Sequence, residues 1–157
     1  MNFFKRKKEK HLMAFTSGKI LPLKEVHDEM FSNALVGEGI AIESNDGKIY
    51  SPVDGEITMI FPTKHALGIK SVHGEEILLH IGIDTVNLKG EGFTSYVENG
   101  QKVSSGDLLL EADLQLIKEK GFFTEAILCI TDPKDLPLTF TSKTEVKAKE
   151  DEIITIG

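Results

Sequence analysis

The feature that most constrains this chain of 157 residues is a series of short apolar or alternating runs separated by turn-forming residues. Turns such as Asn45-Asp46-Gly47 and Ser104-Ser105-Gly106 interrupt the series before any run grows long. Short runs with frequent turns are typical of antiparallel sandwiches and barrels. The sequence therefore predicts an all-β fold, an antiparallel β-sandwich with only short helices. The expected strands cover residues 39–43, 56–61, 67–72, 77–81, 108–112, 126–130 and 153–156.

One helix is expected, over residues 113–120. Asp113 can cap its first turn, three apolar residues follow on one side, and Gly121 can end it. No linker long enough to divide the chain is visible, and the length suits one domain with a sizeable core.

Two segments of the chain resemble each other at a constant offset of 37 residues. Residues 14–20 read AFTSGKI and residues 51–57 read SPVDGEI, so each contains a small residue, a glycine and an isoleucine at matching positions. This pattern predicts an internally duplicated β motif.

Cysteine content and hydropathy limit the class of protein. The one cysteine, Cys129, excludes an intramolecular disulfide and a multi-cysteine zinc site, and its apolar neighbours favour a core position. No uninterrupted apolar run approaches the ~18 residues of a membrane span, and no apolar segment follows the basic N-terminus as in a secretion signal. We therefore expect a cytoplasmic protein.

Charge is distributed unevenly along the chain. Residues 1–10 have a net charge of +4, and since the whole chain has −7, the other 147 residues have −11. An acidic body argues against nucleic acid as a partner and favours a basic protein. We expect residues 1–12 to be a flexible basic leader, with weak membrane-surface contact through Phe3 and Phe4 as the alternative, and residues 13–157 to form the domain.

Two of the five histidines stand next to strands in a way that suggests a site. His65 precedes the run that begins at Ala66, and His80 lies near the end of the run 77–81. If these runs form a hairpin that turns near Gly74, His65 and His80 lie about opposite each other, with Cβ atoms roughly 5 Å apart. Spacing alone leaves a functional pair and two structural histidines equally open.

At these residues the sequence resembles the glucose-type enzyme IIA of the bacterial phosphoenolpyruvate-dependent sugar phosphotransferase system. The resemblance covers most of residues 14–157, and the segment around His80 is its most specific part. The family fold is an antiparallel β-sandwich, which agrees with the strand pattern. The matching segments are FPTKHA (61–66), HIGIDTV (80–86), LKGEGF (88–93), residues 31–42, SPVDG (51–55), and residues 100–103 with Gly106 and Asp107.

This resemblance implies a phosphoryl carrier. His80 matches the histidine that becomes a tele-phosphohistidine, taking phosphate from the phosphocarrier protein HPr and giving it to a cysteine on the IIB domain of a sugar permease. His65 matches the second active-site histidine, which stabilises the transferring group, and Thr63 matches the hydroxyl that orients His65. A phosphoryl acceptor needs a neutral ring with a free lone pair, so these roles suit imidazoles.

The resemblance also implies a docking surface for HPr and for IIB. Phe31, Phe61 and Ile81 match an apolar rim around the histidines, and Asp28 and Asp84 match acidic positions that face a basic partner. No cofactor is implied. A zinc ion between His65 and His80 is expected only as an adventitious occupant. The sugar that the permease carries does not follow from these residues.

Two other classes of protein share features with this sequence. A zinc metallopeptidase with a related duplicated motif would need an H-x-H ligand pair, but the position two before His80 is Leu78. A lipoyl- or biotinyl-carrier-like module, suggested by the turns in residues 97–111, would need a lysine at a hairpin tip within a recognisable motif, and no turn provides one.

Overall fold

The computed structural model describes residues 10–132 and 136–157, whose strands form three sheets with antiparallel pairing in every ladder. The large sheet contains, in spatial order, β13 (Glu145–Val146), β2 (Gly18–Pro22), β3 (Glu38–Ser44), β11 (Glu125–Ile130), β7 (Glu76–Ile81), β6 (Ala66–Ser71), β5 (Gly55–Ile60) and β9 (Lys102–Val103). The two small sheets are β1 (Lys10–Met13), β14 (Glu152–Ile156) and β12 (Leu138–Phe140), and β4 (Lys48–Tyr50), β10 (Leu108–Ala112) and β8 (Phe93–Ser95).

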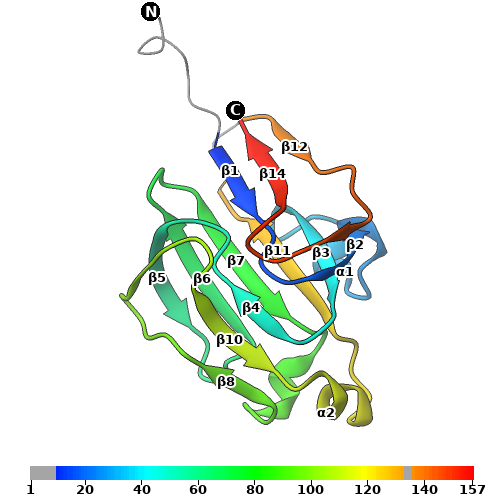
Figure 1. Cartoon of the computed structure of the whole chain (residues 1–157). Helices are drawn as coiled ribbons and strands as arrows, with labels where there is room; N and C mark the ends of the chain where they lie inside the picture. The colour runs from blue at the N-terminus through cyan, green and yellow to red at the C-terminus, as the bar shows by residue number, and fades with distance from the viewer. Residues whose placement is uncertain (1–9, 133–135) are drawn as a thin grey trace, which may run out of the picture.

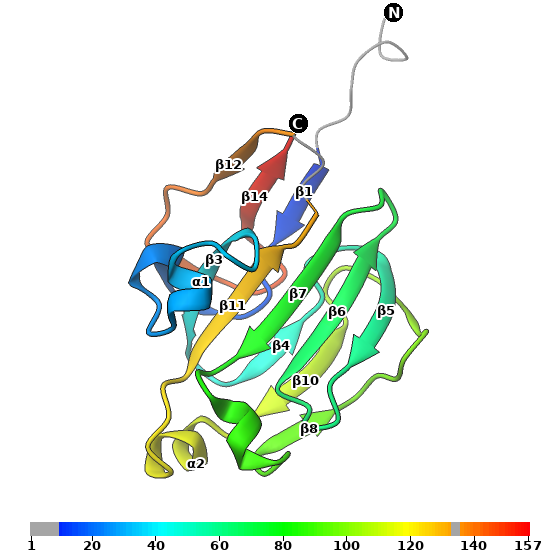
Figure 2. The same ribbon diagram turned by 180° about the vertical axis from the view of Figure 1, so that it is seen from behind.

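The sheets form a β-sandwich, as the sequence predicted. Strands β4, β10 and β8 lie over one face of β5, β6 and β7, and β1 and β14 lie beside each other near the C-terminus (Figure 1). Figure 2 shows the opposite face of the large sheet, where the short helix α1 (Glu29–Ser32) lies over β3 and β11. All seven expected strand runs coincide with strands of the structure.

Alternation along β7 assigns its residues to two separate cores. Ile77, Leu79 and Ile81 point into the main core between the sheets. Leu78 points to the other face, where it packs against a smaller cluster under α1. Successive side chains of a strand point to opposite faces, so His80 lies on the same face as Leu78 and outside the main core. The smaller cluster consists of Val26, Phe31, Ala41, Ile83, Ile127 and Cys129.

The duplicated motif has a structural counterpart at the two ends of the large sheet. Gly18 begins β2 and pairs with Val146 of β13, and Gly55 begins β5 and pairs with Val103 of β9. A Cβ atom at either glycine would collide with a backbone carbonyl oxygen of the neighbouring strand. Both repeats therefore need glycine for the same reason, the close approach of an adjacent strand.

The helices of the described residues are short. The predicted helix is α2 (Leu114–Glu119), where the Asp113 side chain accepts a hydrogen bond from the Leu116 backbone N–H and Gly121 follows with φ of 90°. The sequence analysis missed three elements, α1 and the 3-10 helices η2 (Leu23–Glu25) and η3 (Thr85–Leu88). None of the helices among the described residues is long and apolar enough to cross a membrane.

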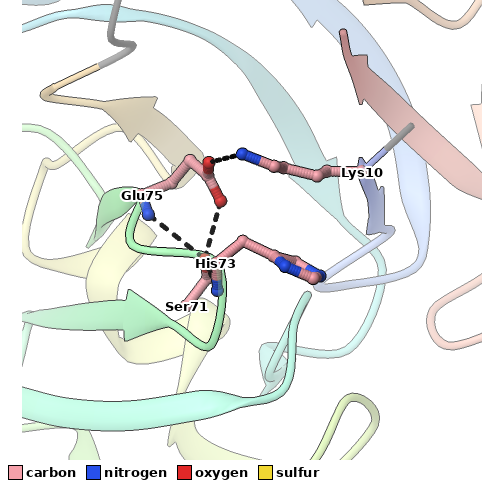
Figure 3. Close-up of polar contacts among 4 residues, drawn as sticks. All are labelled: Lys10, Ser71, His73 and Glu75. Atoms are coloured by element: carbon pink, nitrogen blue, oxygen red, sulfur yellow. Dashed lines mark hydrogen bonds and ion pairs between the residues drawn. The ribbon is translucent and has the colours of Figure 1, made fainter. Parts of the chain in front are cut away.

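The expected leader of residues 1–12 extends too far. Residues 1–9 lie outside the described residues, but Lys10, His11 and Leu12 form part of β1, paired with β14. Leu12 is buried in the main core, and Lys10 forms an ion pair of 2.7 Å with the buried carboxylate of Glu75 (Figure 3). Residues 10–12 of the expected leader therefore belong to a strand.

Cys129 occupies the position that its apolar neighbours predicted. Its side chain is fully buried on β11. Burial, with a smaller contribution from Glu38, raises the pKa of the Cys129 thiol to about 12. Because the thiolate is the reactive form, this cysteine is an inert core residue.

Candidate active site

His80 lies where β7 ends and the chain turns sharply away. Ile81 is the last residue of β7, and Gly82 follows with φ of 80°, a left-handed conformation that favours glycine. A Cβ atom at Gly82 would also collide with the Thr85 side chain. The turn is held by a hydrogen bond from the Gly82 N–H to the Glu125 carbonyl, 2.8 Å. This local structure fixes the imidazole at the outer face of the sheet, partly exposed.

His65 lies one residue out of the register that the sequence predicted with His80. The expected register placed His65 opposite His80, but Ala66 is the residue paired with His80. His65 precedes β6 and follows Lys64, whose φ is 60°. This left-handed residue ends the turn from Phe61, and the His65 carbonyl accepts a hydrogen bond of 2.8 Å from the Ile81 N–H, so His65 lies opposite Ile81 and diagonally across from His80. The register prediction was wrong by one residue.

The two imidazoles form an edge-to-face pair. Their ring centroids are 5.0 Å apart and the rings are inclined by 86°. Nδ1 of His65 lies 2.6 Å from the Thr63 hydroxyl oxygen, so Thr63 fixes the orientation of that ring. His65 is only 3% exposed. A group attached to the more exposed ring, His80, would therefore lie beside an oriented and largely buried imidazole.

Both histidines have lowered pKa values. Burial is the largest cause of the lowering of the His80 pKa to about 4, and the proximity of His65 lowers it further. Asp28 and the backbone of Gly82 act in the opposite direction and raise it. Burial also lowers the pKa of His65. The pair is consequently uncharged at neutral pH, which leaves a lone pair on each ring.

The two nitrogens of His80 have different surroundings. Nδ1 is buried without a hydrogen bond of standard geometry to any described residue, while the Gly82 backbone lies close enough to the ring to raise its pKa. Since the side chain as a whole is partly exposed, Nε2 is the ring nitrogen that can face an incoming group.

Aromatic rings surround the histidines. The Phe31 ring lies 4.9 Å from His80, and the Phe61 ring lies 5.4 Å from His65. Phe93, which the sequence analysis did not assign to the site, lies 6.5 Å from His65. The structure thus brings Phe31 and Phe61 to the histidines as expected.

Ile81 was wrongly assigned to the apolar rim. It follows His80 on the strand, so its side chain points to the opposite face, and it is 0% exposed in the main core. A side chain buried there cannot contact a partner. Exposed apolar side chains occur on the segments that border the site, Met30 beside Phe31 on α1, 53% exposed, and Val86 on η3 after β7, 49% exposed. In the sequence, Val86 stands as an apolar residue between Thr85 and Asn87, and such a position in a polar turn indicates an exposed apolar side chain.

The two expected carboxylates lie at helix starts. The Asp28 side chain accepts a hydrogen bond of 2.8 Å from the Met30 N–H and so caps α1, the helix that carries Phe31. Asp84 is exposed, has φ of 59° and precedes η3. Asp28 lies near enough to influence the pKa of His80, and Asp84 lies four residues beyond His80 on the chain.

No group of three or more histidine, cysteine, aspartate or glutamate side chains that could hold a metal ion occurs among residues 10–132 and 136–157. In this part of the chain, His65 and His80 therefore stand as a pair, with aromatic and aliphatic neighbours.

Comparison with known proteins identifies the family. Residues 10–136 match the family described as phosphoenolpyruvate-dependent sugar phosphotransferase system, EIIA 1. The glucose-specific EIIA component of Halalkalibacterium halodurans is 43% identical over 149 residues, covering 94% of this chain and 86% of the relative. A beta-glucoside-specific EIIBCA component of the same organism is 44% identical over 133 residues, covering 84% of this chain and 21% of that longer protein.

The fold agrees with a solved member. The structure of the glucose permease IIA from Mycoplasma capricolum superposes with a TM-score of 0.87 at 38% identity and covers 99% of both chains. This chain therefore belongs to the EIIA 1 family of the phosphoenolpyruvate-dependent sugar phosphotransferase system.

Proposed function

We propose that His80 is the residue through which this phosphoryl carrier works, and that it takes its phosphoryl group from HPr and passes it to the IIB cysteine of a sugar permease. The chain is a phosphotransferase component that acts in sugar uptake through a phosphohistidine. The observation that supports His80 most directly is its neutral, partly exposed ring, with Nδ1 buried and His65 at a centroid distance of 5.0 Å. The relay operates in the cytoplasm, which we propose as the compartment.

In the first half-reaction, the lone pair of His80 Nε2 attacks the phosphorus of phosphohistidine on HPr. The bond between phosphorus and the HPr nitrogen breaks, and its electron pair returns to the HPr ring. His80 keeps its own proton on Nδ1 throughout. The product is a tele-phosphohistidine, and no cofactor or metal is needed.

His65 stabilises the charge that spreads over the phosphoryl oxygens during this transfer. If the Thr63 hydroxyl donates to His65 Nδ1, the proton of the neutral ring lies on Nε2 and can be donated to a phosphoryl oxygen. In the second half-reaction a cysteine thiolate attacks the phosphorus, and the electron pair of the P–N bond returns to His80 Nε2.

The docking surface consists of the apolar side chains and carboxylates around the two histidines. We assign Phe31 and Phe61 to its centre, where they exclude water from the phosphohistidine, and Asp28 and Asp84 to its edge, where they favour a basic partner. Met30 and Val86 replace Ile81 as exposed apolar contacts. The fused relative named EIIBCA supports a IIB partner, since its name joins A, B and C components in one protein.

Transfer of ³²P from labelled HPr tests this function. Wild-type protein and His73→Ala should become labelled, and His80→Ala should not. His73 is a suitable control because it is an exposed histidine in the turn at the other end of the β6–β7 hairpin. Labelling of His80→Ala at the wild-type level would overturn the assignment.

A further inference from the structure

A buried carboxylate next to the active site has no role in the transfer steps above. Glu125 is the first residue of β11 and is 4% exposed. It lies two residues before Ile127, which pairs with His80, and so it is on the same face of the sheet as His80. A buried carboxylate is costly unless it is hydrogen-bonded, so its partners indicate what it does.

Both hydrogen-bonding contacts that the structure shows for this carboxylate among the described residues are with one residue, His27. Oε1 of Glu125 accepts a hydrogen bond of 3.0 Å from the His27 backbone N–H and lies 2.6 Å from Nδ1 of the His27 ring. The face of the His27 ring stacks on the Phe123 ring, with centroids 3.9 Å apart and an angle of 6° between the ring planes. Glu125 thus holds the backbone and the ring edge of His27, and Phe123 holds the face of the same ring.

His27 directly precedes the segment that contacts His80. Asp28 caps α1, and Phe31 of α1 lies 4.9 Å from the His80 ring. Because α1 has four residues, far fewer than the ~12–15 needed for a stable isolated helix, its position depends on its anchors. The Glu125–His27 contact is the anchor at its N-terminal side.

Residues 123–125, which lead into β11, also hold the chain that follows His80. The Glu125 carbonyl accepts a hydrogen bond from the Gly82 N–H, and the Phe123 carbonyl accepts one from the Ile83 N–H, 3.1 Å. One short segment therefore contacts both stretches of chain that border His80, the one before α1 and the one after β7.

We propose that Glu125 and His27 are positioning residues of the phosphoryl-transfer site, which hold Asp28 and Phe31 in place against His80 and so determine how tightly the phosphoryl donor binds. The proposal rests on the proposed function of His80. It predicts an effect mainly on the KM for phospho-HPr, because the docking surface is displaced while His80, His65 and Thr63 stay where they are.

The test compares Glu125→Ala, Glu125→Gln and His27→Ala with a control, Glu43→Ala. Glu43 is the exposed carboxylate that pairs with Glu125 on β3. We expect Glu125→Ala and His27→Ala to raise the KM for phospho-HPr about tenfold, as when a hydrogen bond to a charged group is lost. The kcat should change less than about twofold. Glu125→Gln keeps an acceptor for the His27 N–H and should restore most of the affinity, and Glu43→Ala should behave as wild type.

The second readout needs no donor protein. The Phe31 ring lies close to His80, so displacement of α1 should shift the NMR signals of the His80 ring protons in Glu125→Ala and His27→Ala. His27 is half exposed, so His27→Ala tests the contact without removing a buried carboxylate. Unchanged His80 signals together with an unchanged KM would overturn the positioning role, even if thermal stability fell. If wild type accepted no label from HPr, the proposed function would fail instead, while the NMR comparison would still decide the positioning.

Discussion

At the scale of single residues, His80 combines accessibility with a neutral ring. Its pKa is lowered from 6.5 to about 4, chiefly by burial and then by His65. A histidine whose pKa lies below the ambient pH is uncharged, so the lone pair that we propose attacks phosphorus is present at pH 7 without prior loss of a proton. Because Nδ1 is buried, Nε2 is the nitrogen that we propose attacks phosphorus.

This charge state gives a prediction for NMR titration. The His80 ring proton signals should change with an inflection near pH 4. In His65→Gln the inflection should move to higher pH, because the neighbouring titratable ring is gone, but it should stay below 6.5 because burial remains the larger cause. A wild-type inflection at or above pH 6.5 would contradict the neutral-acceptor mechanism.

His65→Gln should separate the two half-reactions. Glutamine retains a hydrogen-bond donor but cannot take up a proton as imidazole can. In transfer to the IIB thiolate, His80 is the leaving group and charge at residue 65 matters more than in transfer between two histidines. We expect labelling from HPr to persist while transfer to IIB falls by about 10²-fold. Equal losses in both half-reactions, measured with purified partners, would show that His65 has the same role in each.

The residues of the site differ in how far the sequence could predict them. His80, His65 and Thr63 belong to contiguous motifs, and the structure brings all three together. Ile81 was assigned by proximity to His80 along the chain, although alternation on β7 sends it into the core. Glu125 and His27 are 98 residues apart, so no local pattern could join them.

At the scale of elements, sequence patterns predicted the long strands and missed the short ones. A run such as residues 126–130 shows its strand by continuous apolar character because both faces of β11 are buried. Strands β9 and β13 have two residues each, too few to display any period. The hairpin register was predicted wrongly by one residue because the connecting turn sets it, and the Ser71 N–H to Glu75 carbonyl hydrogen bond that closes this turn is a backbone feature that composition did not reveal.

The turn of the β6–β7 hairpin is joined to strand β1 by a buried ion pair. Oε2 of Glu75, a residue that is 2% exposed, lies 2.7 Å from Lys10 Nζ, and the Ser71 hydroxyl donates to Oε1 at 2.7 Å (Figure 3). Lys10→Met would leave this carboxylate without its cation, at a cost of about 2 kcal/mol. We expect the melting temperature to fall by about 4–8 °C.

The effect of Lys10→Met should depend on pH. Burial on its own raises the pKa of Glu75, but hydrogen bonds from Lys10 and Ser71 outweigh it and lower the pKa below 4.5. A lowered carboxyl pKa contributes stability that is present above the unfolded value and is lost as pH falls through the folded one. The difference between wild type and variant should therefore shrink below pH 4.5 in denaturant titrations. Lys143→Met, which breaks the more exposed pair with Asp151, is the control and should show only a small change.

At the scale of the whole molecule, the site lies at the middle of the large sheet. The strand order places β13, β2, β3 and β11 on one side and β7, β6, β5 and β9 on the other, with the repeated glycines in β2 and β5 at corresponding positions. His80 is on β7 and its neighbour Ile127 on β11, so the proposed phosphoryl site lies where the two halves meet. The offset of 37 residues predicted the duplication, but the meeting of its halves follows only from strand order.

Charge distribution over the chain gives the last prediction. Residues 1–9 have a net charge of +3, so their deletion changes the net charge from −7 to −10 and leaves Lys10 and β1 in place. If a basic donor is steered by the acidic body, the truncated protein should be labelled by phospho-HPr as fast as wild type or about two- to threefold faster at low ionic strength. Rates of both proteins should converge as added salt screens the charges, because the Debye length falls to about 3 Å at 1 M salt.

Stopped-flow or rapid-quench labelling measures these rates. A variant of full length with its leader basic residues replaced by serine separates charge from length. If truncation instead caused a large loss of labelling rate that was the same at every salt concentration, residues 1–9 would contact the donor directly.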